Sequence, residues 1–580
     1  MSGLTVNLTS SALKYVASSA NGQRSICYVQ NVGTLSTTGS VSSSSSWTLI
    51  TDLSSVITNA ASLSYNGKVQ SVSDIYGNVY VSSSFGAAGT WSQRYVNTTN
   101  TNFTPMPAKV SMSLDGKFQV ATIFKNQVTS RIAGTGTVGF SGDGGAATSA
   151  QLNFQSKLVF DASNNITFSD GYNHRIRRIN ASTGIITTIV GSATTGFPAN
   201  GTASSQNLQF PFGVSIDASG SYICNCYHGV FKITGTTLTV IGGSGTSSFL
   251  GDGSAVSTST RFGSPQQNCI DSSGNIYIAD GANRRIRRIA VGTNIITTIC
   301  GNGNGGSTGD GGAATSATLN PTGICVDSFN NIYVSDNSNH RVRRIDAVTG
   351  IITTICGNGT NTSTGDGGAA SSATTSAPMY ICCDRANNLY IAEYGTVSNV
   401  GGNRIRKIRA VNGILSGSCI ISTYAGTGNY TSSGVGGAPT AVSMASTTEI
   451  AFDAFDNAYF TDNGICTILK ATQYASIIRS SDFGQTWSIA TPSISNVAFN
   501  NLSMSKTGQY VSATTLGGAI YRSADYGATW AASGSVSRNW GAIAVSSTGQ
   551  YQIAAGYDMT GYYSTDYGQT WTLNRSEEHT

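Results

Sequence analysis

Arginines at regular spacing are the residues of this chain that most suggest chemistry. The central arginines of four Arg-rich segments are Arg177, Arg287, Arg343 and Arg406. Placed at one radius, they could form a ring that binds an anionic ligand, because each guanidinium offers several N–H donors to carboxylate or phosphate oxygens. The alternative is structural, with each arginine paired to a carboxylate such as Asp170, Asp280 or Asp336. Segment 128–476 holds 20 Lys and Arg against 18 Asp and Glu, and this near balance favours the structural role.

Histidines recur in three of the repeats. They occupy matching positions at His174, His228 and His340. A zinc site needs three or four ligands that converge on one point. These histidines instead follow the repeat, and the Cys-x-Cys pair at Cys224 and Cys226 has no second half. We therefore predict no metal site and no cofactor.

The arginines and histidines lie in a unit of about 58 residues that recurs six times. A strand ending in Asp or an equivalent residue is expected at 165–170, 221–226, 275–280, 331–336, 388–393 and 457–462. An outer β-rich run is expected at 128–134, 185–191, 237–243, 295–301, 351–357 and 420–426. The first outer run precedes the first of these strands and the last repeat lacks its own. Run 128–134 can therefore complete the last repeat and close a ring without exposed strand edges.

These repeats resemble the NHL family. The resemblance rests on YNHRIRRI at 172–179, SNHRVRRI at 338–345 and four Gly-Asp-Gly turns, and it extends over segment 128–476. It implies a six-bladed β-propeller. The Gly-Asp-Gly segments lack the series of oxygen ligands that a calcium-binding loop provides, so we interpret them as structural turns rather than calcium sites.

A second motif, S-x-D-x-G-x-T-W, stands three times near the C-terminus. Its residues are Ser480, Asp482, Gly484 and Trp487; Ser523, Asp525, Gly527 and Trp530; and Ser564, Asp566, Gly568 and Trp571. These boxes resemble the Asp-box (BNR) repeat of sialidase-like propellers. We expect a structural role, with Ser and Asp oxygens bonding turn amides, Gly permitting the bend and Trp filling the space between blades.

The spacing of a second turn indicates that the Asp-box part is split. Each of the last two boxes is preceded by its own Gly-containing turn. The turn glycine stands 17 residues before the box aspartate in both cases, Gly508 before Asp525 and Gly549 before Asp566. A similar turn at Gly116 has no box after it, and the box at Asp482 has no such turn before it. The two are expected to be halves of one blade.

The chain is therefore predicted to be all-β with two propellers. Segments 1–127 and 477–574 form an Asp-box propeller with at least five visible units, interrupted within a blade by the NHL-like propeller at 128–476. Residues 575–580, RSEEHT, resemble the translation of a sequencing adapter, so we expect the outer propeller to be truncated.

Enzymatic activity is the less favoured interpretation. Sialidases need an arginine triad and a Tyr nucleophile activated by Glu, but the outer segments hold no Glu before residue 577 and no Arg-Ile-Pro motif. Other Asp-box hydrolases use paired aspartates. The aspartates outside the boxes are Asp52, Asp74, Asp115 and Asp558. A glycan-active hydrolase or lyase that uses them is therefore the alternative.

Repeat architecture, low charge and the missing catalytic residues favour recognition over catalysis. Only 10% of residues are charged, the net charge is +5, and aromatic residues near the Arg runs are sparse, which argues against nucleic acid. No apolar stretch reaches about 18 residues, so no membrane span is predicted. The first residues contain no basic region followed by a long apolar region, so no signal peptide is predicted. The leading hypothesis is a non-enzymatic scaffold whose propeller loops bind a protein or a glycan. The composition is typical of a surface-exposed or virion-associated protein and predicts no oligomeric state.

Overall fold

The computed structural model describes residues 110–574 apart from 193, 396–401, 412, 454–456, 491–498, 516–517 and 558–559. Before residue 110 it describes the segments 13–18, 24–29, 33–38, 48–49, 58–63, 69–74, 79–82 and 92–95. Regular structure in these residues consists of strands and short 3-10 helices, so the all-β class is confirmed. The chain divides into unit 1, Met1–Asn126 and Gln473–Thr580, and unit 2, Gln127–Thr472.

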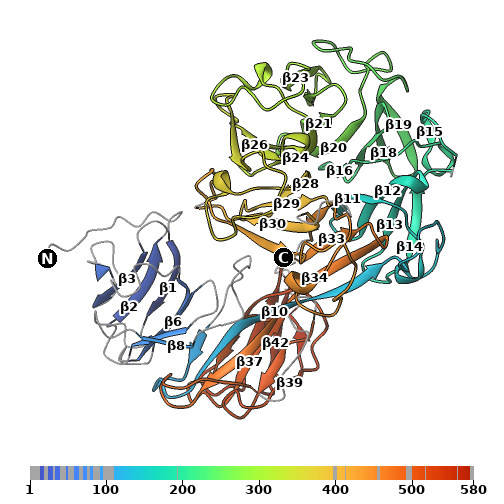
Figure 1. Ribbon diagram of the computed structural model, residues 1–580. Helices are drawn as coiled ribbons and strands as arrows, with labels where there is room; N and C mark the ends of the chain where they lie inside the picture. Colours follow the sequence, from blue (N-terminus) through green and yellow to red (C-terminus); the bar gives the residue numbers. More distant parts are fainter. Residues whose placement is uncertain are drawn as a thin grey trace. The chain divides into compact units, whose positions relative to one another are not determined.

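Unit 2 holds six antiparallel sheets in its described residues (Figure 1). The first sheet is β11 (Gln155–Phe160), β12 (Ile166–Asp170), β13 (Arg175–Ile179) and β14 (Ile186–Val190). The second is β16 (Val214–Ile216), β17 (Tyr222–Cys226), β18 (Gly229–Thr234), β19 (Thr237–Gly243) and β15 (Gly201–Thr202). The third is β20 (Pro265–Ile270), β21 (Ile276–Asp280), β22 (Arg285–Ile289) and β23 (Ile296–Cys300).

The remaining sheets of unit 2 repeat this pattern. The fourth is β24 (Pro321–Val326), β25 (Ile332–Asp336), β26 (Arg341–Ile345) and β27 (Ile352–Cys356). The fifth is β28 (Pro378–Cys383), β29 (Leu389–Glu393), β30 (Arg404–Ile408) and β31 (Ile421–Ala425). The sixth contains β32 (Ile450–Phe452), β33 (Ala458–Asp462) and parts of β34 (Thr467–Ser480) and β10 (Gln119–Ala133).

Short 3-10 helices lie in two recurrent places of unit 2. Between the outer strand of one sheet and the first strand of the next lie η2 (Ala147–Ser149), η4 (Ala203–Ser205), η5 (Ala314–Ser316), η7 (Ala370–Ser372) and η8 (Pro439–Ala441). Between second and third strands lie η3 (Gly171–Asn173) and η6 (Asn337–Asn339).

The six sheets form a closed ring. The first strands contact one another in succession, β11 with β16, β16 with β20, β20 with β24, β24 with β28 and β28 with β32, and β32 contacts β11 again. Second strands such as β12 and β25 are buried along their whole length, because a blade is packed on both faces. This is the arrangement of a β-propeller.

The ring closes by the predicted route. The sixth sheet has the order β32-β33-β34-β10, so β10, which contains 128–133, supplies the outer strand that the last repeat lacks. A glycine marks the same place in each blade: a Cβ on Gly134 (φ +89°) would lie 2.2 Å from the carbonyl oxygen of Cys466, and one on Gly357 (φ +87°) would lie 2.3 Å from that of His340. Only glycine allows this close approach at a positive φ.

Unit 1 contains further antiparallel sheets of the same kind. Two precede unit 2 in the chain: β1 (Leu13–Ser18), β2 (Arg24–Val29), β3 (Gly33–Thr38) and β4 (Thr48–Leu49), then β5 (Thr58–Leu63), β6 (Gln70–Asp74), β7 (Val79–Ser82) and β8 (Ser92–Tyr95). Two follow it: β36 (Phe499–Met504), β37 (Val511–Thr515), β38 (Tyr521–Ser523) and β39 (Ala531–Ala532), then β40 (Trp540–Val545), β41 (Gln552–Gly556), β42 (Gly561–Ser564) and β43 (Thr572–Leu573).

Between these pairs of sheets lie β9 (Val110–Met112), β35 (Ser488–Ile489) and the unit 1 parts of β10 and β34. Contacts run from β1 to β5, β5 to β9, β9 to β36 and β36 to β40, so the sheets are stacked in that order. Apolar side chains lie between several of these sheets in the described residues. One cluster, for example, joins Val120 and Ile477 to Val511 and Trp530. Among the described residues of both units, no helix is long and apolar enough to span a membrane.

Candidate functional site

The four repeated arginines form buried ion pairs rather than an open ring. Each lies on the third strand of its sheet, and no more than 1% of its side chain is exposed. Each guanidinium Nη2 lies 2.6–2.7 Å from an aspartate of a Gly-Asp-Gly turn. The pairs are Arg177 with Asp143, Arg287 with Asp252, Arg343 with Asp310, and Arg406 with Asp366.

Most of the remaining donors are also used, although Nε of Arg177 has no hydrogen-bond partner among the described residues. Three of the arginines have a second carboxylate at 3.4–3.6 Å, in the pairs Arg177 with Asp170, Arg287 with Asp280, and Arg406 with Glu393. Burial raises the pKa of Asp170 and of Asp280 to about 6 and that of Glu393 to about 7. For Arg343 the ion pair is with Asp310, and Asp336 instead accepts hydrogen bonds from Asn320 and Asn339.

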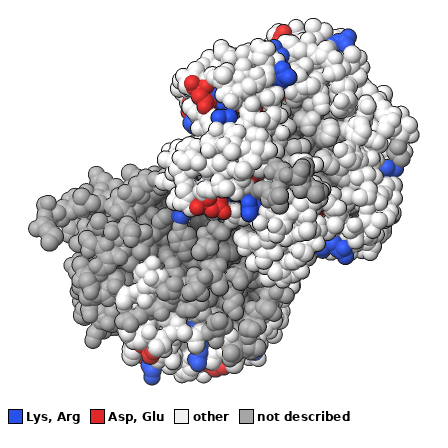
Figure 2. Space-filling view, in the orientation of Figure 1, with Lys and Arg blue, Asp and Glu red and all other residues white. Residues whose placement is uncertain are grey.

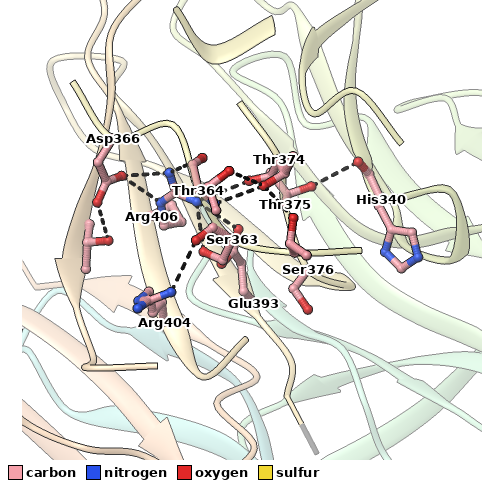
Figure 3. Close-up of polar contacts among 12 residues, drawn as sticks. His340, Ser363, Thr364, Asp366, Thr374, Thr375, Ser376, Glu393, Arg404 and Arg406 are labelled. Carbon is pink, nitrogen blue, oxygen red and sulfur yellow. Dashed lines mark hydrogen bonds and ion pairs between the residues drawn. The ribbon is translucent and has the colours of Figure 1, made fainter. Parts of the chain in front are cut away.

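Figure 3 shows this network around Arg406. Its Nε and Nη2 donate to Asp366, Nη1 donates to the Ser363 hydroxyl, and Nη2 also donates to the Thr364 carbonyl. The guanidinium therefore joins a third strand to the turn before its own sheet. With its donors occupied and its side chain buried, it offers nothing to an external anion, which favours the structural interpretation.

The arginines at the start of the third strands are less enclosed. The guanidinium of Arg175 lies 3.5 Å from the ring centre of Phe140, and that of Arg285 lies 4.0 Å from the ring centre of Phe249. Aromatic rings thus accompany two Arg runs that looked poor in aromatics in the sequence. Each arginine is held against its ring, which is a stabilising cation–π contact.

The repeated histidines are turn residues. His174, His228 and His340 have φ of 55°, 70° and 51°, and Arg284 takes the same conformation at 53°. The Nδ1 of His174 accepts the N–H of Phe210 and that of His340 accepts the N–H of Ala377, so each imidazole binds the next blade. Among the described residues, no group of three or more His, Cys, Asp or Glu could hold a metal ion.

The three Asp boxes have one geometry. In each, the Ser hydroxyl donates to the Asp carboxylate at 2.7–2.8 Å, the Thr hydroxyl donates to its other oxygen, and the Trp Nε1 donates to the Gly carbonyl at 3.0–3.2 Å. Burial would raise the pKa of Asp525, but hydrogen bonds from Thr529 and Ser523 outweigh it and lower that pKa. The side chains of the boxes thus bind one another.

No two of the four aspartates considered for hydrolysis have side chains that both lie in the described residues, so no catalytic pair is seen among them. Asp115 accepts hydrogen bonds from the Ser113 hydroxyl and the Lys117 N–H, which makes it a turn residue. The side chains of Asp52, Asp74 and Asp558 lie outside the described residues.

A buried ion pair at the centre of unit 2 was missed by sequence reasoning. Lys157 and Glu449 occupy the same repeat position on neighbouring blades, four residues before the Asp that follows the first strand. Lys157 Nζ lies 3.5 Å from Glu449 Oε1, and the Glu449 side chain is fully buried. Burial raises the pKa of Glu449 to about 7. Tyr380, also fully buried, stands at that position in the fifth blade.

A second missed feature is an aromatic cluster, defined here as Phe154, Tyr172, Phe210 and Tyr227. Tyr172 stacks on Phe154, with ring centres 4.7 Å apart, and meets Phe210 edge-on at 5.7 Å. Phe210 in turn meets Tyr227 at 6.1 Å. Tyr172 is 51% exposed and the other three rings are partly exposed.

The aromatic cluster departs from the repeat. Phe154 and Phe210 stand seven residues before the Asp that follows the first strand. The other four blades carry Ser264, Asn320, Ala377 and Ser446 there. Phe154 and Phe210 have φ of 59° and 46°, a conformation that is costly for a bulky residue. Aligning the blades and looking for large residues at small-residue positions would have found this site.

Comparison with known proteins supports the propeller class and its two repeats. The NHL repeat model matches residues 318–345, and the BNR/Asp-box repeat model matches residues 562–573. The chain is thus a β-propeller protein. It carries an NHL repeat and an Asp-box repeat, as predicted from its sequence.

Solved structures resemble the chain distantly. A protein of unknown function from Bacteroides thetaiotaomicron is 16% identical, with a TM-score of 0.45 over 80% of this chain and 97% of its own. An auxiliary nutrient binding protein from Bacteroides ovatus is 12% identical, with a TM-score of 0.43 over 80% and 98%. Virginiamycin B lyase from Staphylococcus aureus is 14% identical, with a TM-score of 0.35 over 72% and 95%. A comparison with proteins of curated function finds no sequence match.

Proposed function

We propose that this protein recognises a glycan, without catalysing a reaction, through the aromatic cluster on unit 2. The departure of Phe154 and Phe210 from the repeat carries the proposal. Large side chains at a strained position, partly exposed and confined to two adjacent blades, are not needed to build a blade, since four other blades do without them.

The chemistry of the aromatic cluster suits a neutral sugar. A pyranose ring offers a C–H face that packs on an aromatic ring and hydroxyl groups that bond polar atoms at its edge. Tyr172 and Tyr227 supply phenolic hydroxyls beside the rings. Burial lowers the pKa of His174 and of His228, so both imidazoles are neutral at pH 7 and the surroundings carry no cationic histidine.

The charge distribution agrees with a neutral ligand. On the face shown in Figure 2, charged side chains of the described residues are scattered among neutral ones. The most regular cations of the sequence, Arg177 and its equivalents, are buried in ion pairs. Nucleic acid binding would need exposed cations along a path, so these observations favour a glycan over an RNA.

The proposal includes the domain architecture. We propose that unit 1 is an Asp-box propeller interrupted within one blade by the NHL-like propeller of unit 2. The support is that β10 and β34, through which the chain enters and leaves unit 2, lie side by side in one sheet. The chain would then hold the ligand-binding ring by two adjacent strands.

Hydrolysis has less support than recognition. The described Asp-box aspartates are engaged by Ser and Thr, and Asp115 is engaged by its own turn. A glycosidase needs two carboxyl groups facing each other across a sugar, at about 5–9 Å.

A glycan array with the intact chain tests the proposal. We expect retention of glycans that present a neutral pyranose, and loss of that signal in Tyr172→Ser. Tyr551, which is 57% exposed and lies in unit 1, provides a matched control as Tyr551→Ser. Signal that survives Tyr172→Ser, or release of sugar from the bound glycan, would contradict the proposal.

A further inference from the structure

A repeated tyrosine packs between neighbouring blades of unit 2. In the third to sixth blades it stands six residues after the Asp that follows the first strand, and its hydroxyl donates to that Asp at 2.8–3.1 Å. The pairs are Tyr277 with Asp271, Tyr333 with Asp327, Tyr390 with Asp384, and Tyr459 with Asp453. Each ring packs with apolar residues of its own blade and of the next one. The tyrosine is thus part of how one blade packs on another.

The boundary between the second and third blades lacks this tyrosine. Ile223 stands at the tyrosine position of the second blade. The first blade carries Thr167 there, but its hydroxyl donates at 3.1 Å to the hydroxyl of Tyr222, which the second blade supplies from the other side. The third blade carries Ile276 at the position of Tyr222. Neither position therefore provides a tyrosine between the second and third blades.

A pocket of about 350 Å³ lies at that boundary. Its apolar wall consists of Ile223, Ile241, Val256, Ile270, Ile276 and Ile289. Asp217 and Lys232 form its polar edge, and no aromatic residue stands among its described lining residues. Its volume falls within the range of about 300–1,000 Å³ that is typical of small-molecule sites. The space without a tyrosine is therefore large enough for a ligand.

The polar groups that accompany the tyrosine in other blades are present in the second blade too. A cation stands across from the tyrosine on the third strand. In the fifth blade, for example, Lys407 is the partner of Tyr390, and its Nζ lies 5.3 Å from the ring centre. Lys232 is the partner of Ile223 in the same register, and its side chain is 37% exposed. The boundary thus has the cation and the carboxylate, Asp217, without the phenol ring that accompanies them elsewhere.

Asp217 has room for another hydrogen-bond donor. Its Oδ2 accepts Nζ of Lys232 at 2.7 Å, whereas Oδ2 of Asp271 accepts two hydrogen bonds, one of them from the Tyr277 hydroxyl. Burial would raise the pKa of Asp217, but hydrogen bonds from Lys232 and Ser219 outweigh it and lower that pKa to about 2. Asp217 is therefore an anion at pH 7, and it favours a ligand whose polar end is a hydroxyl donor over one that ends in a carboxylate.

We infer that the pocket between the second and third blades, bounded by Ile223, Asp217 and Lys232, binds a small molecule that carries a phenol group. The ring packs on the isoleucines beside Lys232, and the hydroxyl donates to Asp217, as the tyrosine hydroxyl does to its Asp in four other blades. The site is independent of the glycan proposal, because the aromatic cluster lies at the other end of β17, where Tyr227 follows the strand.

Titration of the intact chain with p-cresol, the tyrosine side chain without its backbone, tests this inference. Ligand-observed NMR should show saturable binding with a Kd of about 1 mM or tighter. The methyl ether of p-cresol has no hydroxyl to donate to Asp217, so it should bind at least about tenfold more weakly. Absence of saturable p-cresol binding, or equal binding of the two compounds, would overturn the inference.

Two variants locate the site. Ile223→Tyr places in the second blade the tyrosine that four other blades carry. It should weaken p-cresol binding at least about tenfold, and its unfolding midpoint in urea should be no lower than that of the natural sequence, because the new ring fills the pocket. Tyr172→Ser, which alters the aromatic cluster, should bind p-cresol as tightly as the natural sequence does. Undiminished binding by Ile223→Tyr, or loss of binding in Tyr172→Ser, would overturn the assignment of the phenol to this pocket.

Discussion

Arg343 and Asp310 lie 2.6 Å apart although 33 residues separate them in the chain. The arginine is on β26 and the aspartate is in the Gly-Asp-Gly turn that precedes β24, so one ion pair ties the third strand of a blade to the chain that enters it. The same relationship recurs at Arg177, Arg287 and Arg406. The repeated charges of unit 2 therefore hold its loops in place.

Replacing Arg343 should destabilise unit 2. Arg343→Met leaves Asp336 buried without its nearby positive charge and frees the turn at Asp310, so we expect a loss of about 3–5 kcal/mol. Asp310→Asn retains one acceptor at a position that is partly exposed, and should cost about 1–2 kcal/mol. Ten of the eleven cysteines lie in unit 2, so thiol labelling in increasing urea measures its unfolding.

The exposed Arg385 provides the control for this pair. Arg385→Met should change the midpoint of thiol labelling very little, since surface substitutions usually fall within about 0.5 kcal/mol. If Arg343→Met were as mild as Arg385→Met, the structural role assigned to the repeated arginines would be wrong.

The sequence predicted the repeated parts of this protein better than the unique ones. Run 128–134 was expected to complete the last blade because each other repeat has its own outer run, and β10 does so. Asp170 and Asp280 were expected beside the arginines, but the closer aspartates, Asp143 and Asp252, were interpreted only as turn residues. Their loops approach the arginines only after the blade has folded.

The features that do not repeat from blade to blade could not be predicted from spacing in this way. Lys157 and Glu449 lie at opposite ends of unit 2 in sequence and meet because the ring closes, so no local spacing reveals them. The aromatic cluster had a signal, since Phe154 and Phe210 hold one repeat position, but it becomes visible only when the blades are aligned and compared for differences.

The central ion pair should give unit 2 a distinct pH dependence. Burial raises the pKa of Glu449 to about 7 in the folded chain, above its ordinary value of 4.5. The folded state then binds the Glu449 proton more tightly than the unfolded state does, so protonation of Glu449 favours folding. The stability gained from this protonation is complete below about pH 4.5 and is lost as the pH rises through about 7. Between pH 5 and pH 8, the natural sequence should lose up to about 3 kcal/mol relative to Glu449→Gln. If the free energy of unfolding changed equally with pH in the natural sequence and in Glu449→Gln, the raised pKa of Glu449 would be ruled out.

An Asp box should contribute measurably to the stability of unit 1. Asp525→Ala removes the acceptor of the Ser523 and Thr529 hydrogen bonds and should cost about 1–3 kcal/mol. All six tryptophans lie in unit 1, so their fluorescence in urea reports its unfolding. Ser547→Ala, at an exposed position, should leave the midpoint unchanged. If the midpoint of Asp525→Ala changed as little as that of Ser547→Ala, the Asp box would not be needed for the stability of unit 1.

Buried thiols should react slowly. Burial raises the pKa of Cys226, Cys300 and Cys356 to about 12, and the thiolate is the reactive form. At pH 7 these cysteines should resist a maleimide in the folded chain and react fully once urea unfolds unit 2. Mass spectrometry of the labelled peptides identifies each site, and rapid labelling without urea would contradict their burial.

Glycan recognition by the aromatic cluster is the central claim of this account. Its most direct test is calorimetric titration of the best array glycan into the natural sequence and into the double variant Tyr172→Ser, Phe210→Ser. We predict an affinity at least tenfold lower in the variant, because the lost stacking contacts are each worth about 1 kcal/mol, with unchanged thiol and tryptophan midpoints. Equal affinity in the two proteins would contradict the claim.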